Sequence, residues 1–459
     1  MRKKFWDKSL FSLKDELGSL NLFKLAIPHF LDLFFISSLS LISTIIIRQI
    51  SETGVVGVDA ASRILNIIIV LTNLVNIGST ILMSIYMGRG DKETVSKIIY
   101  INFFFTLIVN LSLSAIVFIF AKQFLALINA TGEEFHTALT YLRIRVCFLS
   151  FSSITTCIVG MLRCYGDNKP TLICGIVTNV VSTVINILSL TQYNPFPTPL
   201  LCVSFAPVIG TFVGLLIGIA CWLHKKIKIT FKLDFKLFRH MLKVGVPGGI
   251  SNLSYTLSQV ITTAFTLSLA NPITGDNPFN LAKLYLSQIL YMVYHFGYAL
   301  GNANAVMVGR RCGAGDLETA DRMHKQNTII AVCCNIVLFL LVFALKDFIF
   351  KIFSPSDEVM KIISTVMIID FFVEVGRAFN HMGEFGLNAV GDVYATTTIS
   401  VSACWGISVF LAYIFGIALG GNLIGIWIAF AIDECLRGTL YFFRWRSGRW
   451  KKKFIEHKI

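Results

Sequence analysis

The chain has 459 residues, of which 55% are hydrophobic and only 14% are charged. Soluble globular domains carry about 25% charged residues, so this composition excludes a soluble fold and indicates an all-α polytopic membrane protein. The net charge of +14 does not point to nucleic acid, because the basic residues gather at the chain ends and in a few connections, where membrane topology places them.

Residues 1–24 are expected to form a cytoplasmic amphipathic tail. They begin with positive charge but continue polar and amphipathic, unlike the apolar core of a cleavable signal. Their large apolar side chains suit a short helix lying along the membrane interface: Phe5, Trp6, Leu10, Leu13, Leu17 and Leu20.

Twelve membrane-spanning helices are expected in the rest of the chain, since one span needs about 20 apolar residues. Several apolar segments are longer than that, which implies tilt or helix extending past the hydrocarbon. In chain order the expected spans are 25–47, 57–87, 98–121, 137–161, 171–191, 200–223, 244–270, 281–308, 327–350, 360–388, 394–416 and 422–443.

The distribution of Lys and Arg predicts the orientation of these helices. With both chain ends on one side, 29 of the 40 basic residues lie on that side and 6 on the other, and 5 fall within predicted helices. The connections on the cytoplasmic side carry the excess of positive charge, so both termini are expected in the cytoplasm. The six residues counted on the outer side include Lys283.

Three sequence motifs occur twice, and each copy holds the same place in a set of six helices. Six is an even number, so the chain returns to its starting side after the first repeat, and both repeats begin on the same side of the membrane. The two repeats are therefore parallel, related by an axis along the membrane normal. The motif pairs are "FKLAIP" (23–28) with "LKVGVP" (242–247), "GRGDKET" (88–94) with "GAGDLET" (313–319), and "LRCYGD" (162–167) with "LNAVGD" (387–392).

This duplication divides the chain into two lobes. Two six-helix lobes around a cavity that opens to alternate sides are typical of a transporter. The predicted parts are an N-lobe (25–223), a basic cytoplasmic linker (224–243), a C-lobe (244–446) and a basic cytoplasmic tail (447–459).

The motifs resemble those of the multidrug and toxic-compound extrusion (MATE) family, in a bacterial branch. The likeness covers about residues 22–450 and includes "SYTLSQ", "VEVGRAFN", "LNAVGD" and "RWRSGRW" in order. The resemblance implies twelve helices in two six-helix lobes, a V-shaped cavity, and antiport of Na+ or H+ against organic, often cationic, compounds.

The N-lobe departs from the family pattern at its cation site. Members usually carry an Asp in helix 1, where this chain has Ser43, and often an Asn and an Asp in helix 5, where Ser182 and Asn186 stand. Ser43 and Asn186 are therefore candidates to line the cavity with neutral oxygens. Asp32, four residues after Pro28, is expected to bind a cation or proton; the alternative is a polar contact at the kink that Pro28 introduces.

Helix 10 carries an unusual density of charge for a span. Glu374 and Arg377 are spaced to pair along one helix face, as are Asn380 and Glu384. Two interpretations stay open: a structural clasp between helices 10 and 12, or proton uptake and release by Glu374 tuned by Arg377. Glu384 is a further candidate for coupling. The clasp partners in helix 12 are Asp433, Glu434 and Arg437.

Helix 7 has a polar stripe formed by Asn252, Tyr255 and Gln259. With Asn380, these residues are candidates to line a substrate cavity, although a polar stripe can equally hold helices together by hydrogen bonds. The two Gly-x-Gly-Asp turns are interpreted as tight turns with helix N-caps at Asp91 and Asp316 rather than phosphate loops, since no strand precedes them.

The expected function is secondary active export of small amphipathic, cationic organic molecules, coupled to H+ more readily than to Na+. The alternative is a flippase for a lipid-linked or polysaccharide precursor. An enzyme is not expected, because no convergent His/Asp cluster is evident. The eleven cysteines are scattered, so we expect no metal and no cofactor. We expect a monomer in the cytoplasmic (inner) membrane, with the lipid bilayer and no nucleic acid as partner.

Overall fold

The structure is a computed structural model that describes residues 12–15, 18–50, 52–127, 132–227, 229–271 and 276–456. The described residues form twelve long helical segments, one for each span expected from the sequence. The fold is therefore the all-α polytopic fold of two six-helix repeats that the sequence predicts.

The first repeat contains the bent fourth span and five others. The fourth span consists of two helices, α5 and α6, which meet at an angle of 47°. Its elements are α1 (Leu22–Ile50), α2 (Glu52–Gly88), α3 (Lys92–Ile119), α4 (Ala121–Leu127), α5 (Gly132–Cys147), α6 (Leu149–Cys164), α7 (Lys169–Leu188) and α8 (Pro199–His224).

The second repeat begins earlier than predicted, because α9 starts at Phe235, inside the basic linker 224–243. The eleventh span of the chain, which lies in this repeat, contains two π-helical turns, η3 and η4. The twelfth span is followed by a short helix, α17. The elements are α9 (Phe235–Leu267), α10 (Pro278–Gly313), α11 (Leu317–Ala344), α12 (Lys346–Phe350), η2 (Lys351–Phe353), α13 (Asp357–Ala389), α14 (Val393–Ala403), η3 (Cys404–Val409), α15 (Phe410–Ala412), η4 (Tyr413–Ala418), α16 (Asn422–Arg446) and α17 (Arg449–Glu456).

By length and composition alone, six spans among the described residues are apolar enough to cross a membrane, or seven if α5 and α6 count as one. The long helices α10, α13 and α16 are not in this group, and α13 and α16 each carry several charged residues within the span. Ionised side chains are costly inside a bilayer, so the charges of these three helices need partners in the protein interior.

The N-terminal tail differs from its prediction in the part that the structure describes. Residues 12–15 and 18–21 are not helical; β1 (Ser12–Asp15) and β2 (Gly18–Asn21) pair as antiparallel strands, with Leu13 opposite Leu20. Ser and Gly at three of these eight positions have low helix propensity, which explains why the amphipathic pattern does not produce a helix here. Residues 1–11 lie outside the described residues.

The chain divides into two compact units, and the division falls at the repeated prolines Pro28 and Pro247. The N-terminal unit comprises Pro28–Met83 and Asp91–Val246. The C-terminal unit comprises Met1–Ile27, Ser84–Gly90 and Pro247–Ile459.

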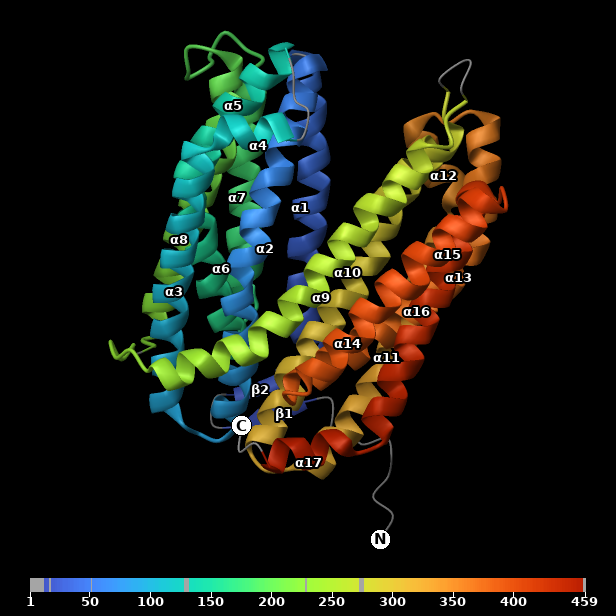
Figure 1. Cartoon of the computed structure of the whole chain (residues 1–459). Helices are drawn as coiled ribbons and strands as arrows, with labels where there is room; N and C mark the ends of the chain where they lie inside the picture. Colours follow the sequence, from blue (N-terminus) through green and yellow to red (C-terminus); the bar gives the residue numbers. More distant parts are fainter. Residues whose placement is uncertain are drawn as a thin grey trace. The chain divides into compact units, whose positions relative to one another are not determined.

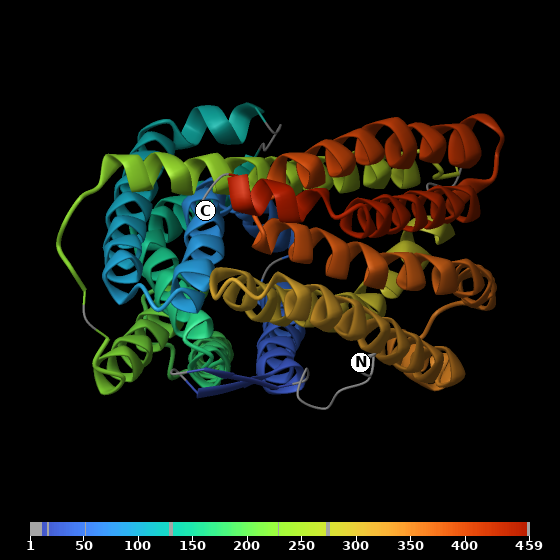
Figure 2. The ribbon, with the colours of Figure 1, turned by 90° about the horizontal axis from the view of Figure 1, so that it is seen from below.

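Each unit has its own interior. In the N-terminal unit α8 packs against α7, α6 and α5, and α3 packs against α6. In the C-terminal unit α13 lies between α16 and α10 and also contacts α11, and these helices run side by side in Figure 1. The short helix α17 packs against the end of α16, which Figure 2 shows from below.

The structure confirms both predicted N-caps. Asp91 Oδ1 accepts a hydrogen bond from the Thr94 backbone N–H at 2.9 Å, and Asp316 Oδ1 accepts one from the Thr319 N–H at 3.1 Å. The preceding Gly90 has a φ of +74°, a left-handed conformation that glycine adopts without steric cost. The two repeats thus use the same turn and the same cap.

Candidate functional site

The interior of the C-terminal unit holds a group of charged side chains contributed by two neighbouring helices. All of them except Arg377 are buried, and Arg377 is largely covered. We call this group the α13–α16 cluster: Asp370, Glu374 and Arg377 from α13, with Asp433, Glu434 and Arg437 from α16.

Two glycines bring the helices of the cluster together. A Cβ added to Gly376 would lie 2.6 Å from the Cys435 backbone nitrogen, and one added to Gly438 would lie 2.9 Å from the Gly376 carbonyl oxygen. The backbones of α13 and α16 are therefore in contact, as is common where small residues meet in membrane helices. This contact lets charged side chains of one helix reach those of the other.

Arg377 connects the two helices. Its guanidinium pairs with Glu374 on its own helix, and its Nε donates to Glu434 Oε1 on α16 at 3.5 Å. Glu374 also accepts a hydrogen bond at 3.3 Å from the amide of Asn335 on α11. The guanidinium lies 5.4 Å from the ring centroid of Tyr294, a cation–π distance.

Arg437 neutralises the acids of α16. It binds Asp433 with two hydrogen bonds, of 3.0 Å from Nε and 2.6 Å from Nη2, and its Nη2 lies 3.1 Å from Glu434 Oε1. Glu434 also accepts a hydrogen bond at 2.6 Å from the Asn380 amide. Asn380, a candidate to line a cavity, thus contacts the α13–α16 cluster directly.

Asp370 stands apart from these ion pairs. Its Oδ1 accepts a hydrogen bond from the Trp427 indole nitrogen at 2.8 Å. Its Oδ2 is buried and has no hydrogen-bond partner among the described residues. Buried polar atoms in proteins are nearly always hydrogen-bonded, so this carboxyl oxygen is where a proton or a small cation fits best.

A cavity of about 60 Å³ adjoins the cluster. One water occupies roughly 30 Å³ in the liquid, so the cavity has room for about two waters or a small ion and not for an organic molecule. Two candidates from helix 7, Tyr255 and Gln259, line it, together with Lys283, Tyr294 and Asp370.

The charges of the α13–α16 cluster, counted together with Lys283, do not balance when all groups are ionised. Four carboxyl groups (Asp370, Glu374, Asp433, Glu434) face two guanidiniums and the Lys283 ammonium, which leaves one negative charge in excess. An unpaired charge in a low-dielectric interior is strongly unfavourable. Binding one proton or one monovalent cation would balance the charges.

The candidate acid of the N-terminal unit has a different setting. Asp32 is buried on α1, and its carboxylate lies so close to Gly175 of α7 that a Cβ there would overlap with it. Arg163 of α6 acts on Asp32 electrostatically and lies 3.3 Å from His29 Nε2. Asn186 is buried on α7 in the same unit.

Two further predicted residues, Asn252 and Glu384, do not line the 60 Å³ cavity. Asn252 is exposed on α9. Glu384 is half-buried on α13, where it interacts electrostatically with Arg437 but forms no ion pair among the described residues. The side chain of Ser43 lies outside the described part of α1.

Three residues of this site were not candidates in the sequence. Lys283 was counted on the outer side of the membrane, but its side chain is 7% exposed within α10, and its Nζ donates to Thr263 Oγ1 at 3.0 Å. Asp370 lies one helical turn before Glu374, a spacing that the sequence shows and that places it beside the charged group of helix 10. No sequence signal links Trp427 to Asp370, 57 residues away.

Comparison with known proteins connects this architecture to one family. The sequence model of the MatE family matches residues 28–188 and 247–414. An uncharacterized transporter, YisQ, of Bacillus subtilis (strain 168) is 28% identical over 443 residues, 94% of this chain and 95% of the relative. A probable multidrug resistance protein, YoeA, of the same organism is 23% identical over 414 residues, 85% of this chain and 87% of the relative.

A solved structure shares the fold over nearly the whole chain. It is the outward-facing conformation of a multidrug resistance MATE family transporter of the MOP superfamily, with a TM-score of 0.85 at 17% identity, covering 94% of this chain and 96% of that one. The family match extends over most of both repeats. This multi-pass membrane protein therefore belongs to the MatE family.

Proposed function

We propose that the protein is a secondary active exporter of small amphipathic organic molecules, coupled to H+ through the α13–α16 cluster. Membership of the MatE family supports export of organic compounds, since similar proteins carry names such as probable multidrug resistance protein. The substrates that best suit such a transporter here are cationic, because a protein that binds and releases a proton can exchange it for positive charge.

One observation carries the choice of H+: the α13–α16 cluster together with Lys283 has one acid too many, and Asp370 is the acid that forms no ion pair among the described residues. Arg377 and Arg437 pair with the other three carboxyls. The hydrogen bond that Asp370 forms within the described part of the chain comes from the neutral indole of Trp427. Protonation would neutralise this carboxyl and give Oδ2 a hydrogen to donate, for example to water in the adjoining cavity.

The coupling cycle follows from the same geometry. Arg377 reaches from α13 to Glu434 on α16, so a change in the packing of these helices alters how well the acids are neutralised. When pairing weakens, the cluster takes up a proton; when pairing is restored, it releases one. Asp32 of the N-terminal unit is a second acid that could respond to the same gradient.

A flippase for phosphate-bearing lipids receives less support from the site. Such an activity needs an excess of cationic charge at the site to meet phosphates. Arg377 and Arg437 are each paired with carboxylates, so their charge is already neutralised within the C-terminal unit.

Transport into proteoliposomes tests the proposal. Wild-type protein should move a fluorescent organic cation such as ethidium when a pH gradient is imposed, and a Na+ gradient of equal size should move much less. Asp370→Asn should lose the response to the pH gradient while still binding the dye. Asp32→Asn and Glu374→Gln, measured in parallel, compare the two other acids.

Two results would overturn the proposal. If neither gradient moves any organic cation, the protein is not an exporter of this kind. If transport depends on pH equally in wild type and Asp370→Asn, coupling does not involve the unpaired acid.

We also propose a cytoplasmic membrane location with both termini in the cytoplasm, and a monomeric transporter. The 29-to-6 asymmetry of basic residues supports the orientation; counting Lys283 with the interior instead makes it 29 to 5. A C-terminal reporter that is active only in the cytoplasm should be active, and its inactivity would reverse the topology.

A further inference from the structure

A cavity of about 400 Å³ lies between α11, α13 and α16 in the C-terminal unit, away from the α13–α16 cluster. It is more than six times larger than the cavity beside Asp370 and shares none of its lining residues. The function proposed above uses neither this cavity nor the residues around it.

The wall of the cavity is largely apolar and open at its edge. Ile329 on α11 and Phe442 on α16 are 41% and 44% exposed, and Phe379 of α13 completes this wall. In a membrane protein, apolar helix surfaces that no protein covers meet lipid tails. The cavity can therefore receive an acyl chain from the side.

The inner end of the cavity is rigid. The Trp445 ring stacks on Trp450 of α17 at 4.4 Å and lies 3.8 Å from the His324 ring, and its indole nitrogen donates to Asp321 at 2.7 Å. His324 in turn is hydrogen-bonded to Asn304 at 3.0 Å. These contacts fix the position of the Trp445 ring in the wall of the cavity.

Among the described residues, two cationic side chains and no acidic side chain line the cavity. Lys325 is held at 2.8 Å from Asp321, which Lys451 also approaches to 3.7 Å. Arg446 is exposed and has no ion-pair partner among the described residues. This corner thus carries three cations against one carboxylate, a net charge of +2.

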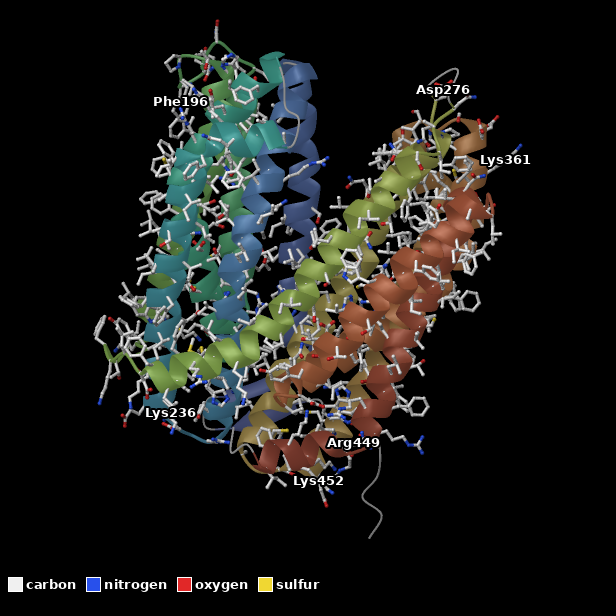
Figure 3. All side chains as sticks on the ribbon, in the orientation of Figure 1. Phe196, Lys236, Asp276, Lys361, Arg449 and Lys452 are labelled. Atoms are coloured by element: carbon white, nitrogen blue, oxygen red, sulfur yellow. The ribbon has the colours of Figure 1, made fainter. Side chains whose placement is uncertain are left out.

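The surrounding end of the unit adds to this positive field. Arg449 and Lys452 lie on α17 at this end of the unit, while Asp276 and Lys361 lie at its opposite end, as Figure 3 shows. Between residues 444 and 456 the basic side chains are Arg444, Arg446, Arg449, Lys451, Lys452 and Lys453, with Glu456 as the one acid.

We propose that this cavity binds an anionic phospholipid of the surrounding bilayer. The phosphate lies between Lys325 and Arg446, and an acyl chain lies along Ile329, Phe379 and Phe442. The combination of adjacent cations with an apolar, laterally open wall is what selects a lipid, because a free phosphate would leave that wall without a partner. Basic pockets between membrane helices commonly bind acidic head groups.

Native mass spectrometry of the full-length protein in non-ionic detergent tests this without any transport measurement. Phosphatidylglycerol and phosphatidylcholine with identical acyl chains are added in turn, so that only the head group differs. The test variant is Lys325→Gln/Arg446→Gln. The control variant is Arg449→Gln/Lys452→Gln, which removes two charges from the same end but outside the cavity.

Wild type should retain phosphatidylglycerol in preference to phosphatidylcholine. Each Lys or Arg near an anionic lipid contributes about 1 kcal/mol, so the test variant should bind phosphatidylglycerol roughly thirtyfold more weakly. The control variant should stay within about threefold of wild type. Thermal unfolding of both variants in detergent shows that each is folded.

A competition experiment decides whether the cavity recognises a lipid or a free phosphate ion. Dodecyl phosphate should displace phosphatidylglycerol at concentrations where inorganic phosphate does not; equal displacement by inorganic phosphate would identify a simple anion site and overturn the lipid proposal. Unchanged binding in the test variant, or equal loss in both variants, would overturn it as well. As a further check, Thr328→Trp, which fills the cavity without changing charge, should also reduce lipid retention.

Discussion

Replacement of Arg437 by methionine tests the charge balance of the α13–α16 cluster most directly. Methionine keeps most of the apolar stem but removes the two hydrogen bonds to Asp433 and the contact with Glu434. Four carboxyls would then face two cations instead of three. Removing one partner of a buried ion pair costs about 3–5 kcal/mol, because the other charge is left without compensation.

The pH dependence of this loss separates charge from packing. Carboxylates left without a cation can be neutralised only by taking up protons, so the folded variant gains stability relative to the unfolded chain as pH falls. We expect Arg437→Met to lower the midpoint of thermal unfolding by on the order of 10 °C at pH 8. The deficit should be clearly smaller at pH 5.5.

The assay is thermal unfolding of purified protein in detergent at both pH values. Adding Asp433→Asn to Arg437→Met should restore much of the loss, because it removes one of the uncompensated charges. Arg449→Met, at an exposed position on α17, is the matched control and should change stability by less than about 0.5 kcal/mol. The reasoning is refuted if the loss is independent of pH and Asp433→Asn does not reduce it.

Three further predictions concern close contacts and a helix cap. Gly376→Ala should destabilise the C-terminal unit by about 1–3 kcal/mol, because the added methyl meets the Cys435 backbone at 2.6 Å. Gly175→Ala should displace the Asp32 carboxylate and change transport without removing a charge. Asp316→Ala should cost about 1 kcal/mol through loss of the N-cap of α11, with the difference from wild type beginning to shrink only as pH falls below about 4.

The sign of the last effect follows from the pKa of Asp316. Partial burial opposes its ionisation, but hydrogen bonds from Thr319 and the charge of Arg311 outweigh burial and hold the pKa below its usual value. Its stabilising contribution is therefore present at neutral pH and lost as pH falls through that pKa. Urea or thermal unfolding at pH 7 and at the lowest pH that the folded protein tolerates, well below about pH 4, measures this, and an equal difference at both values would contradict it.

Each of the two glycine predictions has a control variant. Gly406→Ala places a methyl where no atom lies within 4 Å, so it should be close to neutral in thermal unfolding; a loss equal to that of Gly376→Ala would point to backbone effects instead. Asp32→Asn is the comparison for Gly175→Ala. If Gly175→Ala leaves transport unchanged while Asp32→Asn abolishes it, the position of the carboxylate is not critical.

Much of the architecture is determined by the sequence alone, because it rests on local chemistry. The length of each apolar run sets each span, and all twelve expected spans correspond to helical segments. The Gly-x-Gly-Asp motifs also act locally, since a left-handed glycine and an Asp cap need only the next few residues. The strand pair at residues 12–21 is the exception, because its hydrogen bonds join two segments and override the helical pattern.

The character of the polar site was decided by tertiary packing. The spacing of Glu374 and Arg377 along α13 predicts their pairing, but whether an acid lacks a partner depends on side chains from other helices. The contact of α13 with α16 through Gly376 brings Arg377 and Arg437 to the carboxylates with which they pair. Trp427 donates to one oxygen of Asp370, and the other oxygen has no donor among the described residues. The sequence gives the order of the charged residues along the chain. Whether each charge is compensated in a low-dielectric interior depends on distances in space between residues of different helices.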